Sequence, residues 1–167
     1  MILLNRMKRP ETFDLIPVKQ ITVLLAEDHA KFRKSLKLLI ELSGDIEVIG
    51  EAKNGSEAVK LSDKLRPDII VMDIAMPLLN GLQATRHIMK MNPSARVLIL
   101  SSHADPEYLQ QAMAFGASGY MVKQSSAPVL VDAIREVLKG KAYFSASISK
   151  RLRDESQKVF DKAQLLR

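Results

Sequence analysis

Short apolar runs alternate with helix-like segments along most of the chain, and this alternation restricts the possible folds more than any other feature. The runs are rich in aliphatic and β-branched residues, which is typical of strands that are buried on both faces. They occupy residues 21–26, 46–50, 68–73, 96–100 and 117–122. Five strand–helix units in succession predict an α/β fold in which a five-stranded parallel sheet carries helices on both faces.

The segments between these runs show helical periodicity and punctuation. Apolar residues recur at helical spacing after the first run, at Phe32, Leu36 and Ile40. Asp105-Pro106 has the residue types of a helix N-cap and first turn. We interpret Asn54-Gly55 as a turn. These signals separate the predicted strands by connections long enough for parallel pairing.

Composition excludes several classes of protein. The chain has no cysteine, which rules out disulfides and thiolate metal sites and suits a reducing compartment. No apolar run approaches the roughly 20 residues that span a bilayer. A cytoplasmic protein without a membrane segment is therefore predicted. The net charge of +6 lies mostly in residues 1–20 and 142–167, so the nearly neutral middle offers no basic face for nucleic acid.

Charged and hydroxyl side chains follow four of the predicted strands. Glu27 and Asp28 follow the first strand, Asp73 ends the third, Ser101 follows the fourth and Lys123 follows the fifth. In open parallel sheets, sites form beyond the C-terminal strand ends. We therefore expect these five side chains to meet at one edge.

This set of residue types suits phosphoryl chemistry. Clustered carboxylates repel one another unless a cation neutralises them, and Mg²⁺ prefers oxygen ligands and commonly keeps a phosphate oxygen. A carboxylate can also attack phosphorus to form an aspartyl phosphate. Lys123 would add positive charge, and Ser101 would donate a hydrogen bond to a phosphoryl oxygen. The sequence thus predicts Mg²⁺-assisted phosphorylation of Asp73.

Four strings around these residues resemble the receiver domain of bacterial two-component response regulators. They are VLLAEDH (23–29), DIIVMDIAMPLLNG (68–81), VLILSSH (97–103) and GASGYMVK (116–123), in this order. Their particular forms are most similar to the NarL/FixJ (LuxR-type) subfamily. The resemblance implies a flavodoxin-like receiver fold with strand order 2-1-3-4-5.

The resemblance also implies a role for each position at the edge. Asp73 matches the phosphoacceptor and Lys123 the lysine that pairs with the phosphoryl group. Asp28 matches the direct metal ligand, Glu27 its acidic neighbour, and the backbone carbonyl of Ala75 the third protein ligand. Asp73 itself completes this metal set. Many family members carry aspartate at the position of Glu27.

Two further positions match the conformational switch of the family. Ser101 matches the switch hydroxyl, and Tyr120 matches the aromatic residue that turns inward on activation. Gln124 stands where many members have proline. The resemblance implies a histidine kinase as phosphoryl donor, a homodimer on phosphorylation and transcription regulation. DNA would be bound only through an output domain.

The predicted domain organisation has three parts. Residues 1–20 form an N-terminal extension, residues 21–141 the receiver domain, and residues 142–167 a linker or tail helix. Ile148, Leu152, Val159 and Phe160 give the last part a partial helical stripe. The helix-turn-helix output domain that the resemblance implies is absent, which favours a truncated regulator.

Simpler interpretations remain for single residues. Glu27 and Asp28 could cap the first helix without metal, and Asp73 could be a turn residue. Lys123 could be a solvated lysine, Ser102 could be mistaken for Ser101, and Tyr120 could be an ordinary core tyrosine. His29, His87 and His103 show no metal-ligand spacing.

Two other functions are weighed against the signalling switch. A phosphatase that forms an aspartyl phosphate would need a second aspartate where Ala75 stands, and the sequence has no Gly-rich phosphate loop. A receiver that acts as a protein-binding module without phosphorylation would not require the complete acidic set. A signalling phosphoacceptor, and not an enzyme with turnover, is the prediction.

Overall fold

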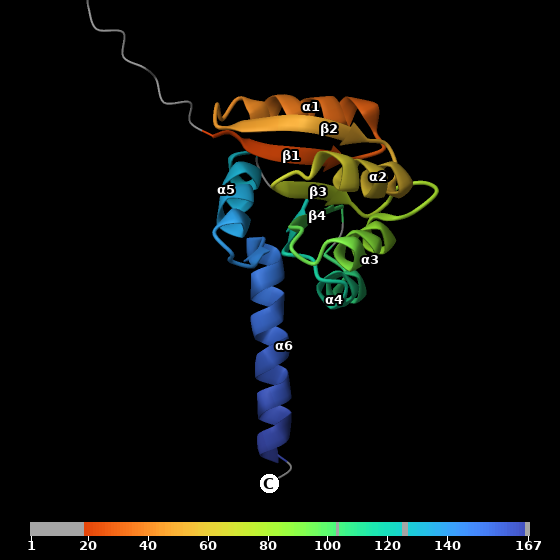
Figure 1. Ribbon diagram of the computed structural model, residues 1–167. Helices are drawn as coiled ribbons and strands as arrows, with labels where there is room; N and C mark the ends of the chain where they lie inside the picture. Colours follow the sequence, from red (N-terminus) through yellow and green to blue (C-terminus); the bar gives the residue numbers. More distant parts are fainter. Residues whose placement is uncertain (1–18, 103, 125–126, 166–167) are drawn as a thin grey trace, which may run out of the picture.

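The structure is a computed structural model that describes residues 19–102, 104–124 and 127–165 (Figure 1). Strands and helices alternate along the chain, as the sequence pattern predicts. In chain order they are β1 (Ile21–Ala26), α1 (Ala30–Glu41), β2 (Ile46–Ala52), α2 (Gly55–Leu65), β3 (Ile69–Asp73), α3 (Gly81–Met91), β4 (Val97–Ser101), α4 (Pro106–Ala114), β5 (Gly119–Val122), α5 (Ala127–Leu138), β6 (Tyr143–Phe144) and α6 (Ala146–Leu165).

All strands belong to one parallel sheet with the order β2-β1-β3-β4-β5-β6. The predicted parallel sheet and the 2-1-3-4-5 order are confirmed, but the predicted number of five strands is wrong. The sixth strand, Tyr143–Phe144, pairs with β5 and has only two residues. A strand this short has no alternation or apolar run that a sequence pattern could detect. The strand exists because these residues pair with β5. Glycine at position 119 permits the close approach of the two strands, since a Cβ there would lie 2.6 Å from the Tyr143 carbonyl oxygen.

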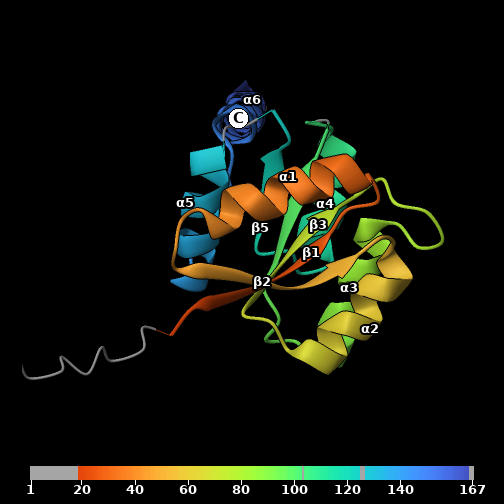
Figure 2. The same cartoon turned by 90° about the horizontal axis from the view of Figure 1, so that it is seen from above.

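Helices cover both faces of the sheet (Figure 2). Alternate residues of each strand point to opposite faces, so neighbouring positions enter different cores. Val23 and Leu25 pack with Ile40 and Ile134, which places α1 and α5 on one face. The opposite face holds a second core, to which β-strands contribute Leu24, Ile70, Ile99 and Tyr120 and to which helices α2, α3, α4 and α6 contribute Ala58, Leu82, Ile88, Leu109 and Ile148.

Side-chain N-caps define the first residues of α4 and α2. Asp105 caps α4 by accepting a hydrogen bond from the Glu107 backbone N–H, with Pro106 in the first turn, as predicted. Asn54-Gly55 is not an isolated turn, because the Asn54 side chain caps α2 by accepting from the Glu57 N–H at 2.8 Å. The Glu57 carboxylate accepts from the backbone N–H of Lys53, the residue before the cap, so both sides of Glu57 hold the start of α2.

Gly81, the first residue of α3, is packed against the end of β3. A Cβ there would lie 1.9 Å from the Asp73 carbonyl oxygen, and a backbone atom cannot move aside as a flexible side chain can. Gly81→Ala is therefore expected to lower the free energy of unfolding by about 3 kcal/mol, measured by urea denaturation. Gly140→Ala is the control, because it has a φ of +83° but no atom within 4 Å. Equal losses in both variants would contradict the proposed overlap.

The segment after α5 first pairs with the sheet as β6 and then continues as α6. Pairing of β6 extends the sheet beyond the predicted boundary at Lys141, and the first turn of α6 buries Ile148 completely. The rest of α6 projects away from the sheet (Figure 1). The side chains of Val159 and Phe160, part of the predicted stripe, lie outside the described residues. None of the helices in the described ranges is long and apolar enough to cross a membrane.

Candidate functional site

The polar residues predicted at the strand ends share one edge of the sheet. Glu27 and Asp28 follow β1, Asp73 is the last residue of β3, Ser101 the last residue of β4, and Lys123 follows β5. Because the strands are parallel, their C-terminal ends meet there. Glu27, Asp73 and Ser101 are buried although they are polar.

Lys123 joins two of the carboxylates. Its Nζ donates to Glu27 Oε2 at 2.7 Å and lies 3.1 Å from Asp73 Oδ1. Only 16% of the Lys123 side chain is exposed, so it is not the solvated lysine of the simpler interpretation. Burial works against its charge, but the hydrogen bond to Glu27 and the charge of Asp73 outweigh burial, and the pKa of Lys123 is raised. Lys123 is therefore held as an ammonium between β1 and β3.

Helix α1 adds two residues to the site that the sequence analysis did not predict. The ring centroid of Phe32 lies 4.9 Å from Lys123 Nζ, within cation–π range. Arg33 Nη1 donates to the Glu27 carbonyl at 2.7 Å, and its Nε donates to Glu51 at 3.0 Å. Arg33 is buried, so its charge needs these partners. No sequence signal distinguished either residue, since Phe32 matched a helix core position and Arg33 an ordinary helical arginine.

The loop after β1 carries an acidic cluster in which one carboxylate oxygen makes no hydrogen bond to the described residues. Oδ1 of Asp28 is buried and has no hydrogen-bond partner among the described residues. Ligand atoms of Glu27, Asp28 and His29 lie within 4.8 Å of one another. The N-cap position of α1 is His29, and its side chain makes no capping hydrogen bond. Asp28 is thus not the helix cap of the simpler interpretation, and Glu27 Oε1 accepts from the His29 N–H.

The charges at the edge do not balance within the protein. Glu27, Asp28 and Asp73 bring three carboxylates, against the one ammonium of Lys123. The formal excess of two negative charges, together with an Asp28 oxygen that no described residue hydrogen-bonds, fits a divalent cation with oxygen ligands. Ala75, the predicted carbonyl ligand, lies two residues beyond Asp73 and is exposed.

Ser101 and Tyr120 are diagonal neighbours on the paired strands β4 and β5, where Tyr120 lies opposite Ile99 and Ser101 opposite Val122. Ser101 is buried whereas Ser102 is exposed, so Ser101 is the hydroxyl of the edge. Tyr120 is fully buried. Its burial raises the pKa of the phenol, although a hydrogen bond with Ser101 acts in the opposite direction. Tyr120 is therefore a core residue that is also linked to the edge.

The histidines of the described residues do not lie together in one site. His29 and His87 are exposed, and His103 lies outside the described residues. His29 nevertheless approaches the acidic cluster, with its Nδ1 3.3 Å from Asp28 Oδ1. The sequence analysis gave His29 no part in the site, because single residues lack a spacing signal.

Comparison with known proteins gives a consistent result. Residues 23–135 match the family described as response regulator receiver domain. The chain is 35% identical over 140 residues to the transcriptional regulatory protein DegU of Brevibacillus brevis, covering 84% of this chain and 59% of that protein. It is 37% identical over 129 residues to LiaR of Bacillus subtilis, covering 77% of this chain and 61% of that protein. The chain thus spans less than two thirds of the length of these relatives.

Solved structures show the same similarity. A LuxR-family two-component response regulator from Aurantimonas sp. SI85-9A1 superimposes with a TM-score of 0.80 at 35% identity, covering 83% of this chain and 99% of that chain. The signal receiver domain of NarL from Mycobacterium tuberculosis has a TM-score of 0.71 at 32% identity, covering 74% of this chain and 99% of that chain.

Proposed function

Because this chain belongs to the response regulator receiver domain family, we propose that it is a signalling switch that accepts a phosphoryl group on Asp73. The observation that carries the proposal is the position of Asp73, which is buried at the strand edge within 3.1 Å of the Lys123 ammonium. A buried carboxylate beside a fixed cation and an incompletely neutralised acidic loop has the charge arrangement that phosphoryl transfer needs.

The proposed reaction forms one bond and breaks one. A carboxylate oxygen of Asp73 attacks phosphorus, and the bond between phosphorus and the donor atom breaks, so the donor leaves with the bonding electrons. Lys123 keeps its hydrogen bond to Glu27 and pairs with an oxygen of the transferred group. Ser101 donates its hydroxyl to another phosphoryl oxygen. Both groups stand at the edge before the donor arrives, so little reorganisation is needed.

The acidic loop is the proposed Mg²⁺ site. Asp28, Glu27 and Asp73 would hold the ion with the backbone carbonyl of Ala75, and the buried Oδ1 of Asp28, which accepts no hydrogen bond from the described residues, supports this assignment. Bound there, Mg²⁺ supplies positive charge beside the phosphoryl oxygens. Arg33 holds the Glu27 carbonyl and so positions the acidic loop.

The proposed partners follow from the relatives. A histidine kinase would donate the phosphoryl group, and the relatives that are transcriptional regulatory proteins suggest a DNA-binding output. A homodimer on phosphorylation and a cytoplasmic location remain predictions. The chain would act through a change of conformation, which needs only a few kcal/mol of difference between the two states.

Incubation of the purified chain with acetyl phosphate, followed by intact mass measurement, tests the proposal. We expect the mass to increase by one phosphoryl group in the presence of Mg²⁺ and to stay unchanged when the metal is chelated with EDTA. Short incubations and a rapid acid quench preserve a short-lived acyl phosphate. A mass that never increases would contradict the proposal and would favour a receiver that binds proteins without phosphorylation.

A further inference from the structure

The start of α6 and the residue before it are attached to Tyr120, which matches the aromatic switch residue of the family. The Ser145 N–H donates to the Tyr120 carbonyl at 3.1 Å. Ile148, fully buried, packs in the same apolar cluster as Tyr120 and Leu109, and Leu152 packs against this cluster one turn later. Any movement of Tyr120 must therefore be accommodated by the first two turns of α6.

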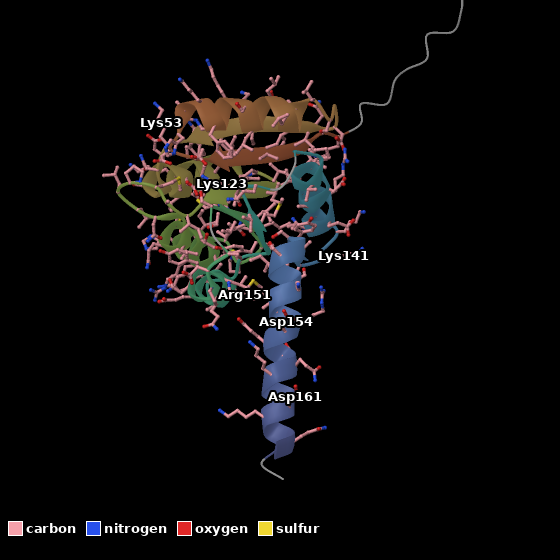
Figure 3. The ribbon with its side chains drawn as sticks, turned by 180° about the vertical axis from the view of Figure 1, so that it is seen from behind. Lys53, Lys123, Lys141, Arg151, Asp154 and Asp161 are labelled. Carbon is pink, nitrogen blue, oxygen red and sulfur yellow. The ribbon has the colours of Figure 1, made fainter. Side chains whose placement is uncertain are left out.

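Arg151 makes a second attachment, to the loop between β4 and α4. Its Nη1 donates a hydrogen bond to the Ala104 carbonyl, three residues beyond Ser101. Glu155, one turn along α6, lies 3.4 Å from Arg151 Nε and helps to orient the guanidinium. Figure 3 shows Arg151 where α6 passes the rest of the molecule, whereas Asp154 and Asp161 lie further along the projecting helix.

The two attachments of α6 lead to Ser101 and Tyr120, two residues that also interact with each other. Ser101 lies in the segment that leads to Ala104, and it is hydrogen-bonded to Tyr120, which is held by Ser145. A group bound at Asp73 that recruits the Ser101 hydroxyl would alter this pair. Because α6 holds the loop on one side and Tyr120 on the other, its docking would change at the same time.

We propose that Arg151 is a positioning residue that couples the docking of α6 to the occupation of Asp73. This inference rests on the proposed function. Coupling between two sites is reciprocal: if an anion at Asp73 changes how firmly α6 is docked, then loosening α6 must change the affinity for that anion by the same factor. Substitution of a residue with a purely structural role in α6 would change stability, but it would change neither the response of α6 to the anion nor the affinity for the anion.

Beryllofluoride with Mg²⁺, a non-covalent mimic of a phosphoryl group on a carboxylate, is the probe for the equilibrium test. In the full chain we expect it to change hydrogen exchange of residues 145–152 by about fivefold or more. In Arg151→Met, which keeps the apolar stem and removes the donor, this difference should disappear. The affinity of Arg151→Met for beryllofluoride, measured by ¹⁹F NMR, should differ from that of the parent. Reciprocity requires that the factor equal the one by which beryllofluoride changes the docking of α6 in the parent.

Arg153→Met is the matched control, since Arg153 is an exposed arginine two residues further along the same helix. It should behave like the parent in both measurements, and circular dichroism should show equal helix content in all three chains. Arg151→Met with the parent's exchange difference and affinity would overturn the inference. A parent that neither binds beryllofluoride nor gains mass from acetyl phosphate would overturn the proposed function as well, so the two failures are distinguishable.

Discussion

Asp73→Asn is expected to abolish the uptake of a phosphoryl group from acetyl phosphate. The amide has nearly the shape of the carboxylate, but it lacks the anionic oxygen that attacks phosphorus. Lys123 keeps its hydrogen bond to Glu27 at 2.7 Å, so the edge retains a charged pair and the variant should fold. Intact mass after incubation with acetyl phosphate and Mg²⁺ measures the loss, and thermal unfolding checks the fold.

Asp63→Asn is the control for the loss of an aspartate elsewhere. Asp63 lies on α2, where its exposed carboxylate pairs with Arg66 at 2.7 Å. An exposed pair of this kind contributes at most about 1 kcal/mol, and Asp63 lies outside the proposed site. This variant should gain mass as the parent does. If Asp73→Asn also gained the full mass, the phosphoryl acceptor would be another residue.

Lys123→Met is expected to produce the largest loss of stability among the site variants. The substitution keeps an unbranched apolar stem but removes the ammonium between Glu27 and Asp73, two buried carboxylates. Removing one partner of a buried ion pair costs about 3–5 kcal/mol, because the remaining charges are left uncompensated. Urea denaturation at neutral pH measures this cost. Uptake of a phosphoryl group should fall as well, since no ammonium pairs with the transferred group.

Added Mg²⁺ should stabilise Lys123→Met more than the parent, because a cation at the acidic loop replaces part of the missing charge. Lys53→Met is the control: Lys53 is exposed and, in Figure 3, separate from Lys123. It should unfold at nearly the same urea concentration as the parent. A loss in Lys123→Met no larger than in this control would show that the ion pair does not support the fold.

The pH dependence of stability gives a second measurement on the same variant. The pKa of Lys123 is raised above 10.5 in the folded protein, so the folded state holds this proton more tightly than the unfolded state. The stabilisation is therefore complete below 10.5 and is lost as the pH rises through the higher folded value. Below pH 10.5 the stability of the parent and of Lys123→Met should therefore depend on pH in the same way, and above pH 10.5 the parent should lose stability more steeply.

Local sequence was sufficient to predict the composition of the strand edge. Each apolar run stops at a charged or hydroxyl residue, and parallel strands must end together, so the spacing along the chain already predicts that Asp73 and Lys123 approach. Helix caps were predicted less well. Asp105-Pro106 was interpreted correctly, whereas Asn54-Gly55 was taken for a turn because the same residue types serve both structures.

Contacts between distant segments were not predictable in this way. The roles of Phe32 and Arg33 arise because α1 packs beside the ends of β1 and β5, which no pattern within α1 records. The two residues of β6 become a strand only because β5 offers unpaired backbone groups beside them. In the same way, Arg151 looks like one of several helical arginines until α6 docks against the loop that holds Ala104.

The sequence by itself determined the fold class, the parallel sheet and the identity of the polar residues at its edge. Hydrophobic periodicity and residue type are properties of each segment alone, so they do not depend on how the segments pack together. Only the tertiary structure decided how these residues interact. It pairs Lys123 with both Glu27 and Asp73, leaves Asp28 Oδ1 without a hydrogen bond from the part of the chain that the structure describes, and joins the start of α6 to Tyr120. The physical reason is that charge compensation and burial depend on distances between segments, and these distances exist only after the helices have packed on the sheet.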